Sequence, residues 1–263
     1  LPERSNLYRL ITANFVALTV GGVLLCFATD KLIFFHLNTI SMKTLFQMLL
    51  LCAITAFTAC GGPDGQKVEA ETAKTEADVS AAAKVYSINS GASMVNWVGA
   101  KPTGEHMGTL QIKDGNLAVV NGNITGGQFT LDMGSLVVTD LEPGQGKEDL
   151  EGHLKTGDFF EVEKYPTGKF TITSVQPTTG VANATHEITG NLTMKNTTKS
   201  VTFPAKVNVS GNEISAVTPS FTIDRTEWGI KYNSSSLADT AKDKIINDEI
   251  GLVINLQANA AAM

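Results

Sequence analysis

The sequence has 263 residues, three cysteines and a formal net charge of −6 at pH 7. From Gly61 onward it carries 16 Lys and Arg against 24 Asp and Glu, and the lysines are dispersed, which argues against nucleic acid as a partner and against a basic membrane-binding face. Cys26 and Cys52 lie in segments that we expect the mature protein to lack. Cys60 would then stand alone, with no disulfide and no thiol-based metal centre, so a hydrophobic core must supply the stability.

The first 41 residues contain a long apolar run. Residues 10–28 carry no charge and are long enough to cross a bilayer as a helix. A complete export signal begins only at Met42, however, and the chain opens with Leu1. We therefore expect residues 1–41 to be an upstream extension from a misplaced start, with a transmembrane helix as the alternative.

Residues 42–60 are built like a lipoprotein signal peptide. A positive start at Met42-Lys43 precedes an apolar run and small residues before Cys60, which is typical of a secretory signal. Thr58-Ala59-Cys60-Gly61 resembles the bacterial lipoprotein box, although Phe57 replaces the usual leucine. We expect acylation of Cys60 and a lipid-anchored protein in the bacterial periplasm or outer membrane. Ordinary cleavage that leaves a free cysteine is the alternative.

The composition changes twice after the signal. Residues 61–84 are mostly Ala, Glu, Lys, Thr and Gly, which predicts a flexible tether spanning roughly 25–30 Å. Residues 85–257 are short alternating runs punctuated by Gly, Asn and Asp, typical of one all-β domain, and residues 258–263 form a tail.

About eight strands are expected in this domain. Asp114-Gly115 and Asn121-Gly122 are dipeptides typical of tight hairpins. Residues 233–246 lack a clear period and predict a long loop. Eight long antiparallel strands close into a barrel that is filled by side chains or holds one slender ligand. The expected strands are residues 93–101, 109–113, 128–133 with an apolar continuation over 136–139, 170–175, 187–195, 200–209, 213–225 and 248–256.

A short plug is expected in the middle of the domain. Leu150 and Leu154 lie four apart and would share one face of a helix that ends near Thr156-Gly157. Phe159 and Phe160 follow. Because adjacent side chains diverge on a helix or a strand, the two rings predict a plug that touches two apolar surfaces.

Three motifs follow one another in the predicted β domain. They are His153-Leu154 with Asp158-Phe159-Phe160, Tyr165-Pro166 and Lys169-Phe170; then residues 190–199, GNLTMKNTTK; then residues 225–230, RTEWGI. These motifs and their order resemble the YceI family of bacterial polyisoprenoid-binding proteins, with two differences: Leu150-Glu151 stands where an Arg-Asp pair is common, and Asn196 replaces a glycine.

The resemblance implies a single antiparallel, lipocalin-like barrel with a pore for a long isoprenoid or other acyl chain. Apolar stripes alone do not separate a filled barrel from a hollow one, and the resemblance favours a hollow one. The candidate pore-lining residues are Trp97, Leu110, Phe129, Leu131, Leu154, Phe159, Phe160, Phe170, Ile172, Phe203, Phe221, Ile223 and Trp228.

Three basic residues are candidates for contacts with a lipid head group: His106, His153 and Arg225. If Ile223 faces the core, Arg225 does too, and a buried arginine needs a carboxylate or a ligand anion. The alternative is an arginine at the strand end that reaches solvent or pairs with Glu227.

Catalysis and metal binding have little sequence support. No His lies at a metal-ligand spacing from another His or a Cys, and no Gly-x-Ser-x-Gly elbow or phosphate loop is present. A hydrolase using His153 with Asp158 is the remaining enzyme hypothesis, against a plain capping interaction. We expect a non-enzymatic carrier or sequestration protein for an isoprenoid, quinone or fatty-acyl lipid, without another cofactor. A ligand-free envelope module that binds proteins is the alternative, and homodimerisation is left open.

Overall fold

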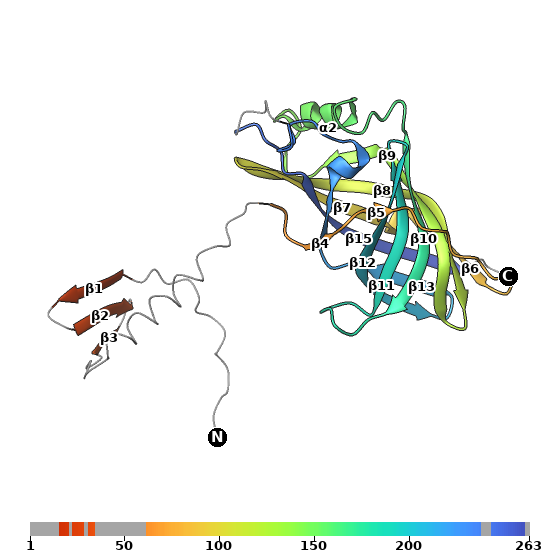
Figure 1. Ribbon diagram of the computed structural model, residues 1–263, viewed down its shortest axis with the longest axis horizontal. Helices are drawn as coiled ribbons and strands as arrows, with labels where there is room; N and C mark the ends of the chain where they lie inside the picture. The colour runs from red at the N-terminus through yellow and green to blue at the C-terminus, as the bar shows by residue number, and fades with distance from the viewer. Residues whose placement is uncertain (1–15, 21–22, 29–30, 35–61, 238–242, 261–263) are drawn as a thin grey trace, which may run out of the picture. The chain divides into compact units, whose positions relative to one another are not determined.

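The computed structural model describes residues 16–20, 23–28, 31–34, 62–237 and 243–260 (Figure 1). It divides into two compact units, Leu1–Cys60 and Gly61–Met263. In the first unit, β1 (Val16–Val20), β2 (Val23–Ala28) and β3 (Lys31–Phe34) form an antiparallel sheet.

Within residues 10–28, for which a transmembrane helix is the alternative, the structure describes the two strands β1 and β2. No helix in the described ranges is both long and apolar enough to span a membrane. The expected signal peptide, residues 42–60 with Cys60, lies outside the described residues.

The second unit is a closed β-barrel, as the sequence predicts (Figure 1). β6 and β7 both lie between β8 and β15, and β13 pairs with both β12 and β15, which closes a ring of 8 strands. In this ring β6 and β7 count as one position, and β14 pairs with β15 beside the ring. The strands of the ring and β14 are β6 (Lys84–Ile88), β7 (Met94–Lys101), β8 (Gly104–Val120), β9 (Asn123–Val138), β10 (Thr167–Pro177), β11 (His186–Met194), β12 (Thr197–Ser210), β13 (Glu213–Val217), β14 (Phe221–Asp224) and β15 (Glu249–Ala260).

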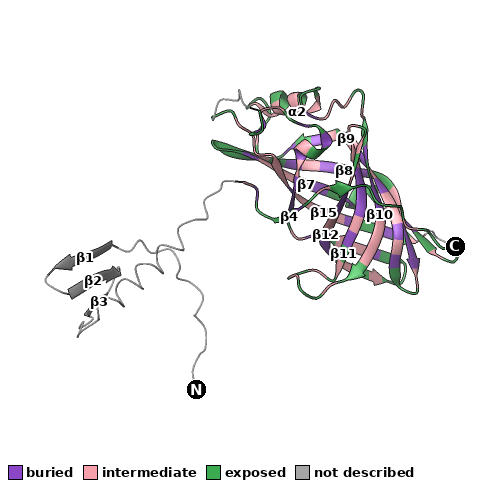
Figure 2. Ribbon diagram, viewed as in Figure 1, coloured by how far each residue is buried: buried purple, intermediate pink, exposed green. Residues whose placement is uncertain are grey.

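Alternating inward side chains form the core, so buried and exposed positions interleave along the strands (Figure 2). A row of rings crosses the barrel: Phe129 stacks on Phe170 at 5.1 Å, Phe170 meets Phe203 at 5.5 Å, and Phe203 stacks on Phe221 at 4.8 Å between centroids. Gly190 on β11 makes room for this row, since a Cβ there would lie 2.2 Å from the ring of Phe170. The aromatic residues therefore join β9, β10, β12 and β14.

Only one of the two predicted hairpin dipeptides forms a turn. Asn121 (φ 51°) and Gly122 (φ 82°) form the two-residue turn between β8 and β9, which confirms that prediction. The prediction for Asp114-Gly115 is wrong, because both lie inside β8 beside a β-bulge, where Gly115 lets the backbone of Phe129 approach. Similarly, the single strand expected over residues 213–225 is interrupted at Pro219 and becomes β13 and β14.

The segment predicted as a flexible tether lies on the barrel instead. We call residues 62–74 the strap. Within it, β4 (Gln66–Val68) pairs in parallel with β14, and β5 (Glu71–Thr72) pairs with β12. Val68 is 4% exposed and joins the core, and the side-chain amide of Asn191 holds both the N–H (2.9 Å) and the carbonyl (2.7 Å) of Lys74. The domain therefore begins before residue 85.

The expected tail also needs correction. β15 extends to Ala260, and Ala258 is 1% exposed where it pairs with Ile214 and Ile88. Two short 3-10 helices complete the unit: η2 (Ser90–Ala92) precedes β7, and η3 (Arg225–Trp228) follows β14. Residues 243–246 belong to the expected long loop, and residues 238–242 of that loop lie outside the described ranges.

Candidate ligand-binding cavity

A helical plug covers one end of the barrel. The helix α2 (Lys147–Lys155) begins after Gly146, has Glu148 and Asp149 in its first turn, and ends at Thr156 (Figure 1). Glu151 ties it to the wall, because its Oε1 accepts a hydrogen bond from the N–H of Val138 at 2.9 Å. The predicted plug is thus present as a short helix followed by the Phe159-Phe160 turn.

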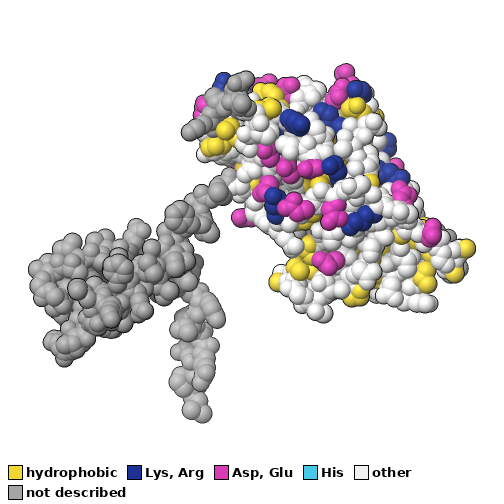
Figure 3. Space-filling view, in the orientation of Figure 1, with side chains coloured by type: hydrophobic (Ala, Val, Ile, Leu, Met, Phe, Trp, Pro, Cys, Tyr) yellow, Lys and Arg dark blue, Asp and Glu magenta, His cyan; other side chains and the backbone are white. Residues whose placement is uncertain are grey.

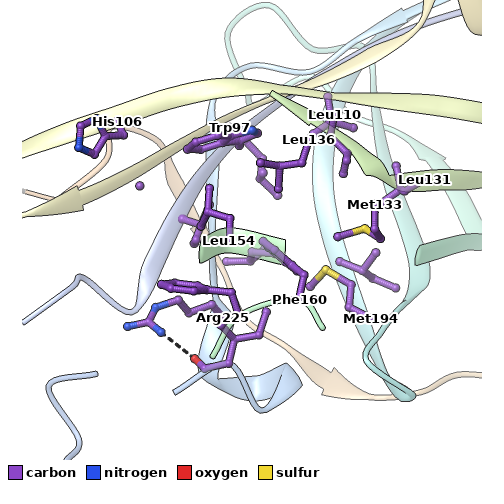
Figure 4. A pocket seen from close by; sticks show the side chains of 18 of the residues that line it. Trp97, His106, Leu110, Leu131, Met133, Leu136, Leu154, Phe160, Met194 and Arg225 are labelled. Atoms are coloured by element: carbon purple, nitrogen blue, oxygen red, sulfur yellow. Dashed lines mark hydrogen bonds between the residues drawn. The ribbon is translucent and has the colours of Figure 1, made fainter. Parts of the chain in front are cut away.

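Between the plug and the barrel wall lies a cavity of about 380 Å³ with an almost wholly apolar lining. In Figure 4, Trp97, Leu110, Leu131, Met133, Leu136, Leu154, Phe160 and Met194 surround this space. The predicted residues that line it are Trp97, Leu110, Phe129, Leu131, Leu154, Phe159, Phe160, Phe170, Phe203, Phe221 and Ile223, together with His106, His153 and Arg225.

Two candidate pore residues are buried outside the cavity lining. Ile172 is 5% exposed and packs within the solid part of the core. Trp228 is 1% exposed, lies in η3, and donates its indole N–H to the carbonyl of Leu192 at 3.0 Å. The prediction that both line the pore is not met, because large apolar side chains occur equally in a filled part of a barrel and around a hollow one.

Sequence reasoning missed several lining residues. Met133 and Leu136 belong to runs already predicted as strands, so a stricter use of the two-residue alternation would have included Met133. The lining residues outside the predicted set are Val95, Gly99, Ala100, Lys101, Met133, Leu136, Leu150, Leu192, Met194, Val201, Ile230, Tyr232, Ile246, Ile250, Leu252 and Ile254.

Two histidines bordering the cavity pair with carboxylates. His106 Nδ1 lies 2.8 Å from Asp140 Oδ2, and His153 Nε2 lies 3.0 Å from Asp158 Oδ2. Partial burial acts to raise the pKa of Asp140, but hydrogen bonds from the Met107 N–H and from His106 outweigh it and hold that pKa below its usual value. The Asp140 carboxylate is therefore ionised at neutral pH.

His153 also belongs to an aromatic cluster that no sequence motif suggested. Its ring meets Phe159 edge-on at 5.1 Å and Tyr232 edge-on at 4.9 Å, and Phe159 lies 5.3 Å from Tyr232. The cluster joins the plug to the loop after η3, and the pairing with Asp158 agrees with the capping interaction expected for His153.

Arg225 is fully enclosed, at 1% exposed. Its Nε donates to the Asn247 carbonyl (3.1 Å), Nη1 to the Ile230 carbonyl (2.8 Å), and Nη2 to the Ile246 carbonyl (3.1 Å) and to Asp248 Oδ1 (3.2 Å). The expected alternative of pairing with Glu227 is wrong, because Glu227 pairs with Lys199 at 2.6 Å. Burial lowers the pKa of the guanidinium, which the carboxylates of Asp248 and Asp224 oppose.

The apolar lining of the cavity suits the binding of an apolar chain. A metal site is a separate matter: across the described ranges, no group of three or more His, Cys, Asp or Glu side chains is placed to hold a metal ion. Within the wall, the indole nitrogen of Trp97 is buried without a hydrogen-bond partner among the described residues. The fold and the cavity together define a small closed β-barrel with an apolar interior, as in lipocalin-like proteins.

The chain belongs to the YceI-like domain family, whose family model matches residues 66–258. This confirms the resemblance carried by the three motifs. The match also begins inside the strap, in agreement with the pairing of β4 and β5 to the barrel.

Curated relatives and solved structures resemble parts of the chain. A UPF0312 protein of Pseudomonas putida is 32% identical over 129 residues, which cover 47% of this chain and 63% of that protein. Another, from Pseudomonas paraeruginosa, is 42% identical over 65 residues, covering 25% and 32%. The chain thus matches less than two thirds of the length of these relatives.

Among solved structures, Burkholderia cenocepacia BcnA aligns with a TM-score of 0.49 at 21% identity, covering 65% of this chain and 99% of that one. A polyisoprenoid binding domain from Saccharophagus degradans aligns with a TM-score of 0.47 at 16% identity, covering 67% and 98%.

Proposed function

We propose that the barrel binds the long apolar tail of an isoprenoid or similar amphiphilic lipid in its cavity, with the polar head near the plug and the His106 border. The observation that carries this proposal is the cavity of about 380 Å³ with its almost wholly apolar lining. Water in such a cavity finds almost no hydrogen-bond partners in the apolar lining. An acyl or prenyl chain instead removes the apolar lining from water and gains dispersion contacts with it.

The expected affinity depends on tail length. One prenyl unit, roughly four methylene equivalents, contributes about 3 kcal/mol on burial. Association costs on the order of 4–15 kcal/mol, so about four or more buried units are needed for useful binding. The motif resemblance to polyisoprenoid-binding proteins favours prenyl tails, such as those of quinones and polyprenols, among the chains that satisfy this requirement.

The proposed setting is the bacterial cell envelope, with Cys60 acylated. Gly62 lies against the barrel, since a Cβ there would be 2.6 Å from the side-chain amide of Asn247. The backbone carbonyl of Asn247 accepts a hydrogen bond from Arg225 Nε. The two peptide links from Cys60 to Gly62 reach at most about 7 Å. An acyl group on Cys60 would thus keep this edge of the barrel at the membrane surface, where a lipid could pass directly between bilayer and cavity.

Lipid extraction followed by mass spectrometry tests the proposal. Gly99 lines the cavity, and a Cβ there would meet nothing within 4 Å, so Gly99→Leu should fill the space without a clash. Gly180→Leu is the matched control, because Gly180 is equally open but lies on an exposed loop. The full-length wild type and the control should release about one lipid per chain, and Gly99→Leu much less.

Absence of lipid from the wild type, together with no uptake of added prenol, would overturn the proposal and favour a module that acts by protein contact. Equal lipid in both glycine variants would show that the lipid lies elsewhere.

A further inference from the structure

We infer that the lipid head group is uncharged, because the basic side chains that line the cavity are nearly all paired with carboxylates of the protein. This inference rests on the proposed function, since it concerns the head of a lipid whose tail fills the cavity. The basic residues in the lining are Lys101, His106, His153 and Arg225.

Arg225 cannot offer the contact by which arginine recognises phosphate. That contact uses two parallel N–H groups and an unpaired positive charge. Here both N–H groups of Nη2 are taken by the Ile246 carbonyl and Asp248, Nε is taken by the Asn247 carbonyl, and one N–H of Nη1 is taken by the Ile230 carbonyl. Only the second N–H of Nη1 remains, and the charge of the guanidinium is already paired with Asp248. Arg225 can therefore donate a single hydrogen bond to a neutral oxygen of the head group.

The two histidines are similarly paired. His106 lies 2.8 Å from Asp140 and His153 lies 3.0 Å from Asp158, so protonation of either ring would be balanced by its own carboxylate. Neither histidine therefore offers an unpaired cation to a head group. From Gly61 onward the chain also carries 16 Lys and Arg against 24 Asp and Glu, a net charge of 16 − 24 = −8, which opposes the approach of an anionic head.

The plug supports the same conclusion, because it adds no unpaired cation to the lining. Leu150 is an apolar residue of α2 that lines the cavity. Glu151, the next residue, is used within the fold by its hydrogen bond to Val138.

The inference is tested with two probes that share one tail, geranylgeraniol and geranylgeranyl diphosphate. Binding to the delipidated full-length protein is followed by the tryptophan fluorescence expected to respond at Trp97, which lines the cavity. The alcohol should bind at least about ten-fold more tightly. Because added salt screens repulsion, raising the ionic strength should tighten diphosphate binding and leave alcohol binding unchanged.

Equal or tighter binding of the diphosphate, or binding of the diphosphate that weakens with salt, would overturn the inference and leave the proposed function standing. Failure of both probes to bind would refute the proposed function itself, and the inference with it. These outcomes distinguish a wrong head group from a wrong ligand class.

A pair of isosteric variants gives a second test. Asp248→Asn removes the negative partner of Arg225 and should narrow the preference for the alcohol several-fold. Asp114→Asn is the matched control, because Asp114 is exposed on β8 and does not line the cavity. If a folded Asp248→Asn protein kept the wild-type ratio of alcohol to diphosphate affinity, the role assigned to this ion pair would be contradicted. If that variant does not fold, the salt dependence of diphosphate binding to the wild type tests the inference instead.

Discussion

Truncation of Phe159 tests how the plug is held on the barrel. Its ring is 7% exposed and contacts the rings of His153 and Tyr232. Replacing a buried phenylalanine by alanine commonly costs about 3–5 kcal/mol, of which the aromatic pairs account for about 0.5–1.5 kcal/mol each. Because Phe159 already borders the cavity, much of the new void joins existing space, and we expect the lower end, about 3 kcal/mol.

For a domain of this size, each kcal/mol changes Tm by about 2–4 °C, so Phe159→Ala should lower it by about 6–12 °C. Calorimetry and urea unfolding of lipid-free protein measure this, and Phe159→Leu, which keeps apolar bulk, should lose less. Phe160 is only partly buried, so Phe160→Ala should reduce lipid retention more than stability. If both alanine variants melted and retained lipid like the wild type, the plug would be a surface loop and the reasoning would be wrong.

Three further predictions concern the strap, Asp140 and the anchor. Asn191→Ala should cost about 1–2 kcal/mol and speed amide exchange at Lys74, because it removes both hydrogen bonds to the strap; unchanged exchange would contradict this. The lowered pKa of Asp140 stabilises the fold fully above its ordinary value of 3.8, and this contribution is lost as the pH falls through the folded-state pKa. The Tm difference between wild type and Asp140→Asn should therefore shrink in acid, and a pH-independent difference would refute it. Cys60→Ser should abolish partitioning into the detergent phase; partitioning at the wild-type level would rule out acylation.

Local sequence signals predicted those features that depend on local geometry. Asn121-Gly122 forms the expected hairpin because both residues need positive φ, and Asn196 (φ 62°) likewise adopts the left-handed conformation that asparagine tolerates. Leu150 and Leu154 lie on the cavity-facing side of α2 because helical spacing places them together. Asp114-Gly115 has the same composition as a hairpin, but its conformation is set by the approach of β9.

Contacts between distant segments could not be predicted. The strap has the composition of a disordered linker, and it is ordered through Val68 in the core and through Asn191, which is 117 residues from Lys74. Arg225 was correctly expected to need a carboxylate once buried, but Asp248 lies 23 residues away, in a region without a motif. The position of the cavity depends on where inward side chains from opposite strands do not pack against one another. The alternation of apolar and polar residues along a single strand does not determine this.

Photo-crosslinking tests the central claim most directly. A 20-carbon prenyl alcohol with a diazirine at the tail end would be bound to the full-length protein, irradiated, and the labelled residues located by tandem mass spectrometry. An apolar tail inside the barrel predicts labels on cavity residues such as Leu131, Met133 and Met194. Labels confined to outward-facing residues such as Met94 and Met107, each 39% exposed, would contradict a ligand-binding cavity.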